Sequence, residues 1–255
     1  MISSNPLPAL PHEPAPDDIR LSEVISALSY ALDLTEGAPE GHSVRTCLIG
    51  MRIGRELGLD ADARSSLFYA LLLKDAGCSA NAAATCEMFG ADDHVVKRTW
   101  KTTDWAGRWQ SFVHVARNVR PGAGLAAKVR QVAGFAGAGA VGTELVRTRC
   151  ERGGEIARML EMTDETAAAI RALDEHWDGR GVPLGLRGEE IPLLARIACL
   201  AQTTEIFHSV YGLQGALAVA RERSGKWFDP RLVRVLASLR SDGAFWAGLS
   251  FDDAR

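Results

Sequence analysis

The pattern of apolar and polar residues predicts helices along most of the chain. Apolar residues recur at intervals of three and four, the spacing that places them on one face of an α-helix. The second such segment ends at Gly58, a residue typical of the position just after a helix. We find no series of alternating residues that would indicate a sheet. The sequence therefore predicts an all-α fold, with helices over 21–34, 42–59, 60–77, 164–177, 191–210 and 229–239.

Residues 95–140 have a different composition. They combine three tryptophans with many basic residues and a single acid, Asp104, and they end in a Gly/Ala-rich stretch. Such a segment either binds phosphate groups or an acidic partner, or forms a solvated helix pair whose tryptophans turn into the core. The basic residues are Lys97, Arg98, Lys101, Arg108, Arg117, Arg120, Lys128 and Arg130.

Composition narrows the class of protein. The 255 residues are 47% hydrophobic with a net charge of −3, which suits a soluble domain and argues against a nucleic-acid binder built on overall positive charge. The five cysteines form no CxxC pair, so we expect a reducing, cytoplasmic setting. No apolar run is long enough to span a bilayer. The proline-rich residues 1–18 are expected to be a disordered leader, and 246–255 a C-terminal tail.

Three stretches together resemble one known family. They are "GHSVR" (41–45) followed by "LLLKDAGC" (71–78), then "HWDGRGVPLGLRGEEIPLLARI" (176–197), and finally "SGKWFDPRLV" (224–233). In this order they resemble the HD-GYP family, bacterial phosphohydrolases of the HD superfamily that cleave cyclic di-GMP. The resemblance implies a bundle of about seven core helices over 19–245, with a helical insertion at about 90–140.

The resemblance also implies two or three iron or manganese ions, but the residues that would bind them have changed. His42 and Asp75 match the family pattern, whereas Lys74 stands where the histidine of the His-Asp pair belongs. The other changes are Cys78 for a lysine, Cys150 for a histidine, Leu173 and Asp174 for paired histidines that precede a retained Glu175, and Gln202 for an aspartate.

Lys74 argues against the full metal centre. An ammonium group has no lone pair, and it repels a divalent cation by about 2 kcal/mol at 4 Å even in bulk water. We therefore expect a degenerate centre without a cofactor, in which Lys74 pairs with Asp75 or Asp174. The alternative is a single iron or manganese ion held by His42, Asp75 and Asp174. The vestigial site comprises Lys74, Asp75, Cys78, Cys150, Asp174 and Glu175.

The middle stretch adds a loop and two arginines. Asp178, Gly179, Gly181 and Pro183 are expected to form a loop that borders the ligand site in active relatives. Lys74, Arg180 and Arg196 are candidates to bind phosphate groups, although Arg196 could instead hold the loop. Cys78 and Cys150 could face each other as a redox pair or thiolate ligands, or be small buried thiols.

These observations predict a sensory or protein-interaction module in bacterial signalling that does not hydrolyse cyclic di-GMP, more a binding domain than an enzyme. The alternative is a single-ion phosphohydrolase acting on a cyclic dinucleotide or another phosphoester. The expected partners are a protein, a cyclic dinucleotide, an output domain or regulator, or a second copy in a homodimer. No stretch resembles a helix-turn-helix, so we expect no direct reading of DNA and no membrane partner.

Overall fold

The structure is a computed structural model that describes residues 19–36, 38–78 and 138–249. Within these residues the chain is helical, without a β-strand, which confirms the predicted all-α class. The helices are α1 Leu21–Thr35, α2 His42–Glu56, α3 Ala61–Leu73, α8 Ala138–Met159, α9 Asp164–Arg171, α10 Leu193–Glu222, α11 Pro230–Ser238 and α12 Gly243–Gly248, with 3₁₀ turns at Gly188–Glu190 (η3) and Leu239–Ser241 (η4).

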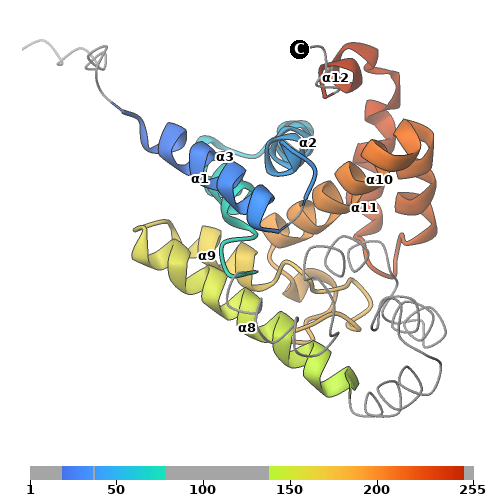
Figure 1. Cartoon of the computed structure of the whole chain (residues 1–255). Helices are drawn as coiled ribbons and strands as arrows, with labels where there is room; N and C mark the ends of the chain where they lie inside the picture. The colour runs from blue at the N-terminus through green and yellow to red at the C-terminus, as the bar shows by residue number, and fades with distance from the viewer. Residues whose placement is uncertain (1–18, 37, 79–137, 250–255) are drawn as a thin grey trace, which may run out of the picture.

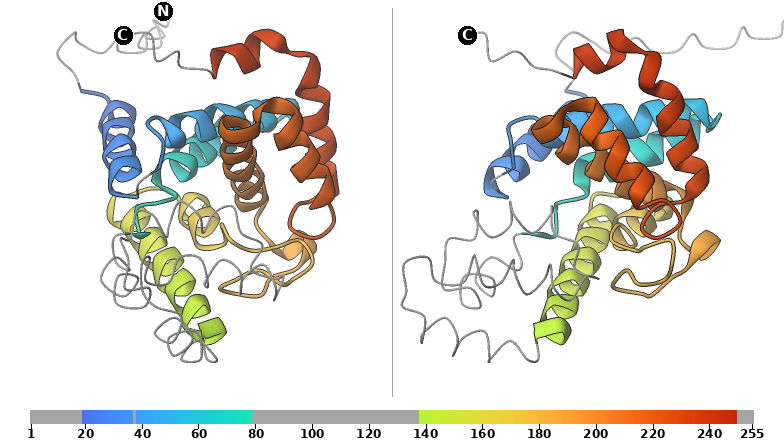
Figure 2. Two further views of the ribbon diagram at one scale, coloured as in Figure 1. Left: turned by 45° about the vertical axis from the view of Figure 1, so that its right-hand side comes forward. Right: turned by 90° about the vertical axis from the view of Figure 1, so that its right-hand side faces the viewer.

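Helix α10 is the central element of the bundle. It packs against α2, α3, α9 and α11, while α1 lies across α2 and α3 and α8 packs along α9. Figures 1 and 2 show α8 at one end of the bundle and α12 at the opposite end. The candidate site is formed by residues of α2, α8 and α10, together with the turns that follow α3 and α9.

Small residues let the central helices approach one another closely. Gly50 in α2 is buried, and a Cβ atom there would come within 2.6 Å of Leu71 Cδ1 in α3 and 3.4 Å of the Ala201 methyl group in α10. The core around this crossing is made of aliphatic side chains from every long helix, as the apolar faces read from the sequence require.

Side-chain caps explain several helix starts. The Asp60 carboxylate accepts a hydrogen bond from the Ala63 amide at the start of α3, and Thr163 does the same for Thr166 at the start of α9. Asp33 in α1 accepts hydrogen bonds from both the amide and the hydroxyl of Ser43. That buried contact fixes the end of α1 against the first turn of α2.

Helix boundaries differ from the expected ones at functionally important points. The segment expected to be helical over 60–77 leaves the helix after Leu73, and the one expected over 164–177 ends at Arg171. Helix α10 runs twelve residues past 210, interrupted at Gly212, where φ is 68°. The sequence analysis did not predict α8, because its Gly/Ala-rich start lacks a clear apolar period.

Some boundary predictions fall outside the described residues. The leader 1–18 lies there, as does the expected insertion at 90–140 except for its last three residues, which begin α8. The expected boundary between the bundle and a C-terminal tail, at residue 245, falls inside α12. Trp246 and Leu249, which lie beyond it, are buried in the core. None of the described helices is long and apolar enough to cross a membrane.

Candidate functional site

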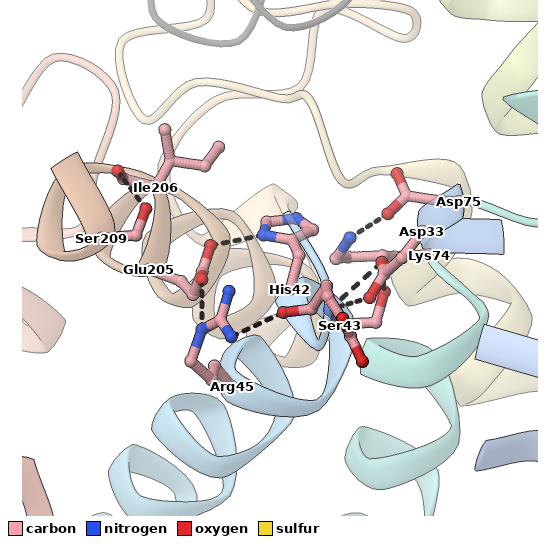
Figure 3. A network of polar contacts seen from close by, with 10 residues as sticks. Asp33, His42, Ser43, Arg45, Lys74, Asp75, Glu205, Ile206 and Ser209 are labelled. Atoms are coloured by element: carbon pink, nitrogen blue, oxygen red, sulfur yellow. Dashed lines mark hydrogen bonds and ion pairs between the residues drawn. The ribbon is translucent and has the colours of Figure 1, made fainter. Parts of the chain in front are cut away.

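The first part of the site is the turn that ends α3. Lys74 is the C-cap residue of the helix, and both it and Asp75 are buried. The Lys74 ammonium donates a hydrogen bond to Asp75 Oδ2 and forms an ion pair with it, and Figure 3 shows Nζ directed at that carboxylate. The other carboxylate oxygen, Asp75 Oδ1, lies 3.7 Å from Cys78 Sγ. A cation of the protein itself thus neutralises the retained aspartate.

The second part joins α8 to the turn after α9. Arg149 Nη2 donates to Asp174 Oδ2 and forms an ion pair with it, and Cys150 Sγ lies 3.5 Å from the same oxygen. Arg149 and Asp174 are largely buried, with side chains 19% and 21% exposed. Arg149 was missed in the sequence analysis, because it lies 25 residues from Asp174 and outside the three stretches that resemble the family.

These two parts form one charged centre. Gly77 packs directly on α8, since a Cβ atom there would lie 2.0 Å from the Arg149 carbonyl oxygen. Burial alone would lower the pKa of Arg149, but the negative charge of Asp174, supported by Cys78, Cys150 and Asp75, raises it well above its ordinary value. The guanidinium therefore remains charged, and the centre contains two carboxylates, each paired with a side-chain cation.

His42, the first residue of α2, is held by a separate network. Its Nδ1 is hydrogen-bonded to Glu205 Oε2 of α10, and Arg45 Nε donates to Glu205 Oε1 at 2.7 Å (Figure 3). Burial would raise the pKa of the Glu205 carboxyl, but His42 and Arg45 hold it below its usual range. Glu205 is a residue of the candidate site that the sequence did not predict. It lies one helical turn after Gln202, which was a usable signal.

The described residues do not fit a metal ion. Iron or manganese needs several imidazole or carboxylate ligands converging on one point. Among residues 19–36, 38–78 and 138–249, no three His, Cys, Asp or Glu side chains are grouped in this way. The residues of the predicted single-ion set are each engaged elsewhere: His42 with Glu205, Asp75 with Lys74, and Asp174 with Arg149.

Two buried cysteines have perturbed thiols. Burial raises the pKa of the Cys150 thiol well above its ordinary value, and it raises that of Cys199 to about 12. Both groups are therefore protonated at neutral pH in the metal-free protein. Cys78 and Cys150 both affect the pKa of Arg149.

The loop that follows begins with Glu175, which is buried. Its carboxylate accepts hydrogen bonds from the amides of Leu184, Gly185 and Leu186, so one side chain closes the loop on itself. Burial raises the pKa of Glu175, against the opposing effect of these amides. Glu175 thus belongs to the loop and not to the charged centre, although the sequence placed it in the vestigial site.

Predicted loop residues shape the backbone. The Asp178 carboxylate accepts from the Arg180 amide at 3.0 Å, and Gly179 adopts φ 80°, a region that favours glycine. Gly181 packs against the backbone of His176, because a Cβ atom at Gly181 would lie 2.1 Å from the His176 amide nitrogen. The Val182–Pro183 peptide bond is cis.

The three candidate phosphate-binding residues differ in exposure. Lys74 has no exposed side-chain surface and is paired with Asp75. Arg196 Nη1 donates to Asp229 Oδ2 at 2.8 Å, and its guanidinium lies over the Trp177 ring. Arg180 is 73% exposed, so among these three it is the residue that a ligand in solvent can reach without displacing a buried pair.

Comparisons with known proteins identify related sequences. The profile of the HD domain family matches residues 95–232, more than half of the chain. A 3′3′-cGAMP-specific phosphodiesterase 3 of Vibrio cholerae is 40% identical over 252 residues, covering 91% of this chain and 51% of that protein. The cyclic di-GMP phosphodiesterase response regulator RpfG of Xanthomonas campestris is 38% identical over 76 residues, covering 27% of this chain and 20% of the regulator.

A solved structure agrees with these matches. The crystal structure of a cyclic GMP-AMP specific phosphodiesterase of V. cholerae, V-cGAP3, superposes with a TM-score of 0.68 and 35% identity over 91% of this chain and 51% of that one. The chain thus spans about half the length of the 3′3′-cGAMP-specific phosphodiesterase and of the V-cGAP3 structure. The relatives favour the phosphodiesterase alternative of the sequence analysis over its sensory module.

Proposed function

The chain belongs to the HD-domain family, in its HD-GYP branch, and from this premise we propose that it acts on cyclic dinucleotides as part of a phosphodiesterase. One observation carries the proposal: the match to a 3′3′-cGAMP-specific phosphodiesterase runs along nearly the whole chain instead of being confined to one motif. The intact loop from Glu175 to η3 supports it, because the resemblance places this loop beside the ligand.

The loop offers chemistry suited to a dinucleotide. Arg180 projects a charged guanidinium into solvent, and such a group binds a phosphate through paired N–H donors. Its partner Asp178 is only 18% exposed and is held in the loop by the Arg180 amide, so the acid positions the backbone while the arginine side chain can move to a ligand. The proposed role of Arg180 is to contact a phosphate of the cyclic dinucleotide.

A second candidate function is binding of the cyclic dinucleotide without hydrolysis. The observation that favours it is the pairing of Asp75 with Lys74 and of Asp174 with Arg149, which engages both carboxylates of the predicted single-ion site. In this case the domain would report the presence of the nucleotide to a partner protein, which is one form of the sensory module predicted from the sequence.

The two candidates separate in one set of measurements on the full chain. The protein is incubated with 3′3′-cGAMP or cyclic di-GMP and Mn²⁺ or Fe²⁺, and linear products are followed by chromatography. Binding is measured in parallel by isothermal titration. Hydrolysis supports the phosphodiesterase, and heat of binding without products supports the binding domain. The absence of both products and heat at high micromolar nucleotide would overturn the proposal.

An arginine substitution tests the contact. Arg180→Gln removes an exposed charge and is expected to weaken nucleotide binding about tenfold, the equivalent of one charge-assisted hydrogen bond. The matched control is Arg147→Gln, which also removes an exposed, ion-paired arginine but lies on α8. Equal affinities for the two variants would contradict the role of Arg180.

A further inference from the structure

We propose that Lys74 and Arg149 take the place of metal ions in this centre, so that the charged centre folds without a metal and binds none. The residues present in the centre do not fit the metal ions that the resemblance to the family implies. Both carboxylates of the predicted single-ion set, Asp75 and Asp174, are instead paired with side-chain cations of the same chain.

The charges of the centre balance without an added ion. Lys74 balances Asp75, and Arg149 balances Asp174. A divalent ion placed between the two carboxylates would meet an ammonium and a guanidinium at short range in a largely buried region, where repulsion is weakly screened. Neither cation can relieve it by becoming a ligand, because protonated lysine and arginine have no lone pair to offer.

The two cations do different work in the fold. Lys74 and Asp75 are neighbours in one turn, so their pair neutralises charge but connects no distant elements. Arg149 lies on α8 and Asp174 lies in the turn after α9, so their pair joins two elements across 25 residues of chain. Arg149 therefore contributes the larger share of stability, and Lys74 contributes mainly the exclusion of a metal.

The neighbouring donors do not rescue a metal site. His42 is oriented by Glu205 through Nδ1, and the Cys150 thiol lies against Asp174, which is already paired with Arg149. Nucleotide hydrolysis would then need metal ligands that the described residues of this chain do not supply. The inference is independent of the proposed substrate, because a centre without metal is compatible with both nucleotide binding and its absence.

The direct test is metal analysis of the purified full chain after incubation with Mn²⁺ or Fe²⁺ and desalting. We expect no stoichiometric metal, and an unchanged Tm on addition of Mn²⁺ or EDTA, since a ligand that binds only the folded state raises Tm. One ion per chain that raises Tm and is lost in Asp75→Asn would overturn the inference. Neither outcome depends on a nucleotide, so this failure is distinguishable from that of the proposed function.

Removing the cations sharpens the test. Arg149→Leu is expected to lower Tm by about 5 °C or more, because it leaves Asp174 charged and largely buried. The control Arg147→Leu, two residues earlier on α8 and half exposed, should shift Tm by less than about 2 °C. Equal shifts would contradict the role given to Arg149.

The double variant Lys74→Met, Arg149→Leu frees both carboxylates. If the cations replace a metal, Mn²⁺ should raise the Tm of this variant while leaving the wild-type Tm unchanged. A Tm that Mn²⁺ raises equally in both proteins, or in neither, would contradict the replacement. Should the double variant fail to fold, Lys74→Met alone, measured with and without Mn²⁺, gives the same comparison for Asp75.

Discussion

Asp174 and Glu175 are adjacent acids that belong to two different regions of the molecule. The Asp174 carboxylate faces the charged centre and is neutralised by the Arg149 guanidinium. The Glu175 carboxylate points into the following loop and accepts hydrogen bonds from three backbone amides. A role fulfilled by side-chain charge can be rebuilt by exchanging one side chain, whereas a role fulfilled by backbone amides depends on the whole path of the chain.

This difference predicts that the two regions tolerate substitutions to different degrees. The geometry of the loop allows few substitutes for its glycines and its acid, and the same stretch carries the clearest resemblance in sequence. In the charged centre Lys74 and Arg149 neutralise the carboxylates, and opposite charges in contact remain balanced whatever their chemical source. The loop should therefore be more sensitive to small steric changes than the centre is to matched changes of charge.

The largest expected effect is that of Gly181→Ala in the loop. A methyl group would press on the backbone of Glu175 and His176, at 2.1 Å from the nearest atom, and backbone cannot rotate away as a side chain can. We expect a loss of about 3 kcal/mol or more in the free energy of unfolding, measured by denaturant titration. Gly243→Ala, which meets open space, is the control and should be nearly neutral. A fully stable Gly181→Ala protein would refute the rigid loop.

Gly77→Ala applies the same change to the charged centre. The added methyl group would meet the Arg149 carbonyl oxygen and the Gly153 amide nitrogen, so α8 must shift away from the turn after α3. The expected loss is about 2 to 3 kcal/mol, somewhat less than for Gly181→Ala because a helix can move as a unit. Thermal unfolding checks this order, and a larger loss for Gly77→Ala would reverse the comparison.

The next effect is that of Glu175→Ala. Three loop amides would lose their acceptor, and we expect about 2 kcal/mol of destabilisation, with faster hydrogen exchange at residues 184–186. Glu190→Ala is a matched control, since Glu190 is exposed and accepts from one amide, that of Arg187. Protection of 184–186 that persists in Glu175→Ala would mean that other contacts close the loop.

The sequence predicted the helices better than their ends. Helical periodicity located α1 and α2 because an apolar face leaves a clear signal, and the Gly/Ala-rich start of α8 gives no such signal. The expected helix over 164–177 stops at Arg171 for a tertiary reason: the chain must turn there to bring Asp174 to Arg149 and Glu175 to the loop. Local propensity does not encode such a turn.

The site was predicted where partners are close in sequence and missed where they are distant. The substitution of Lys74 beside Asp75 was visible directly, and their pairing was among the expectations. The pairs Arg149–Asp174 and His42–Glu205 join residues 25 and 163 positions apart, and nothing in a single sequence marks such contacts. Their chemistry was therefore readable only after the helices had been placed.

Arg196→Lys gives the smallest expected effect and separates the two arginines associated with the loop. Arg196 joins α10 to the N-cap residue of α11, Asp229, and covers the Trp177 ring, so its planar guanidinium makes contacts that an ammonium does not reproduce. We expect a loss of about 1 kcal/mol in stability without a direct loss of nucleotide affinity. The matched change Arg180→Lys should leave stability within a few tenths of a kcal/mol, because that side chain is mostly in solvent. If Arg196→Lys instead weakens nucleotide binding at unchanged Tm, then Arg196 contacts the ligand, and the division between a rigid loop support and an exposed phosphate-binding arginine must be redrawn.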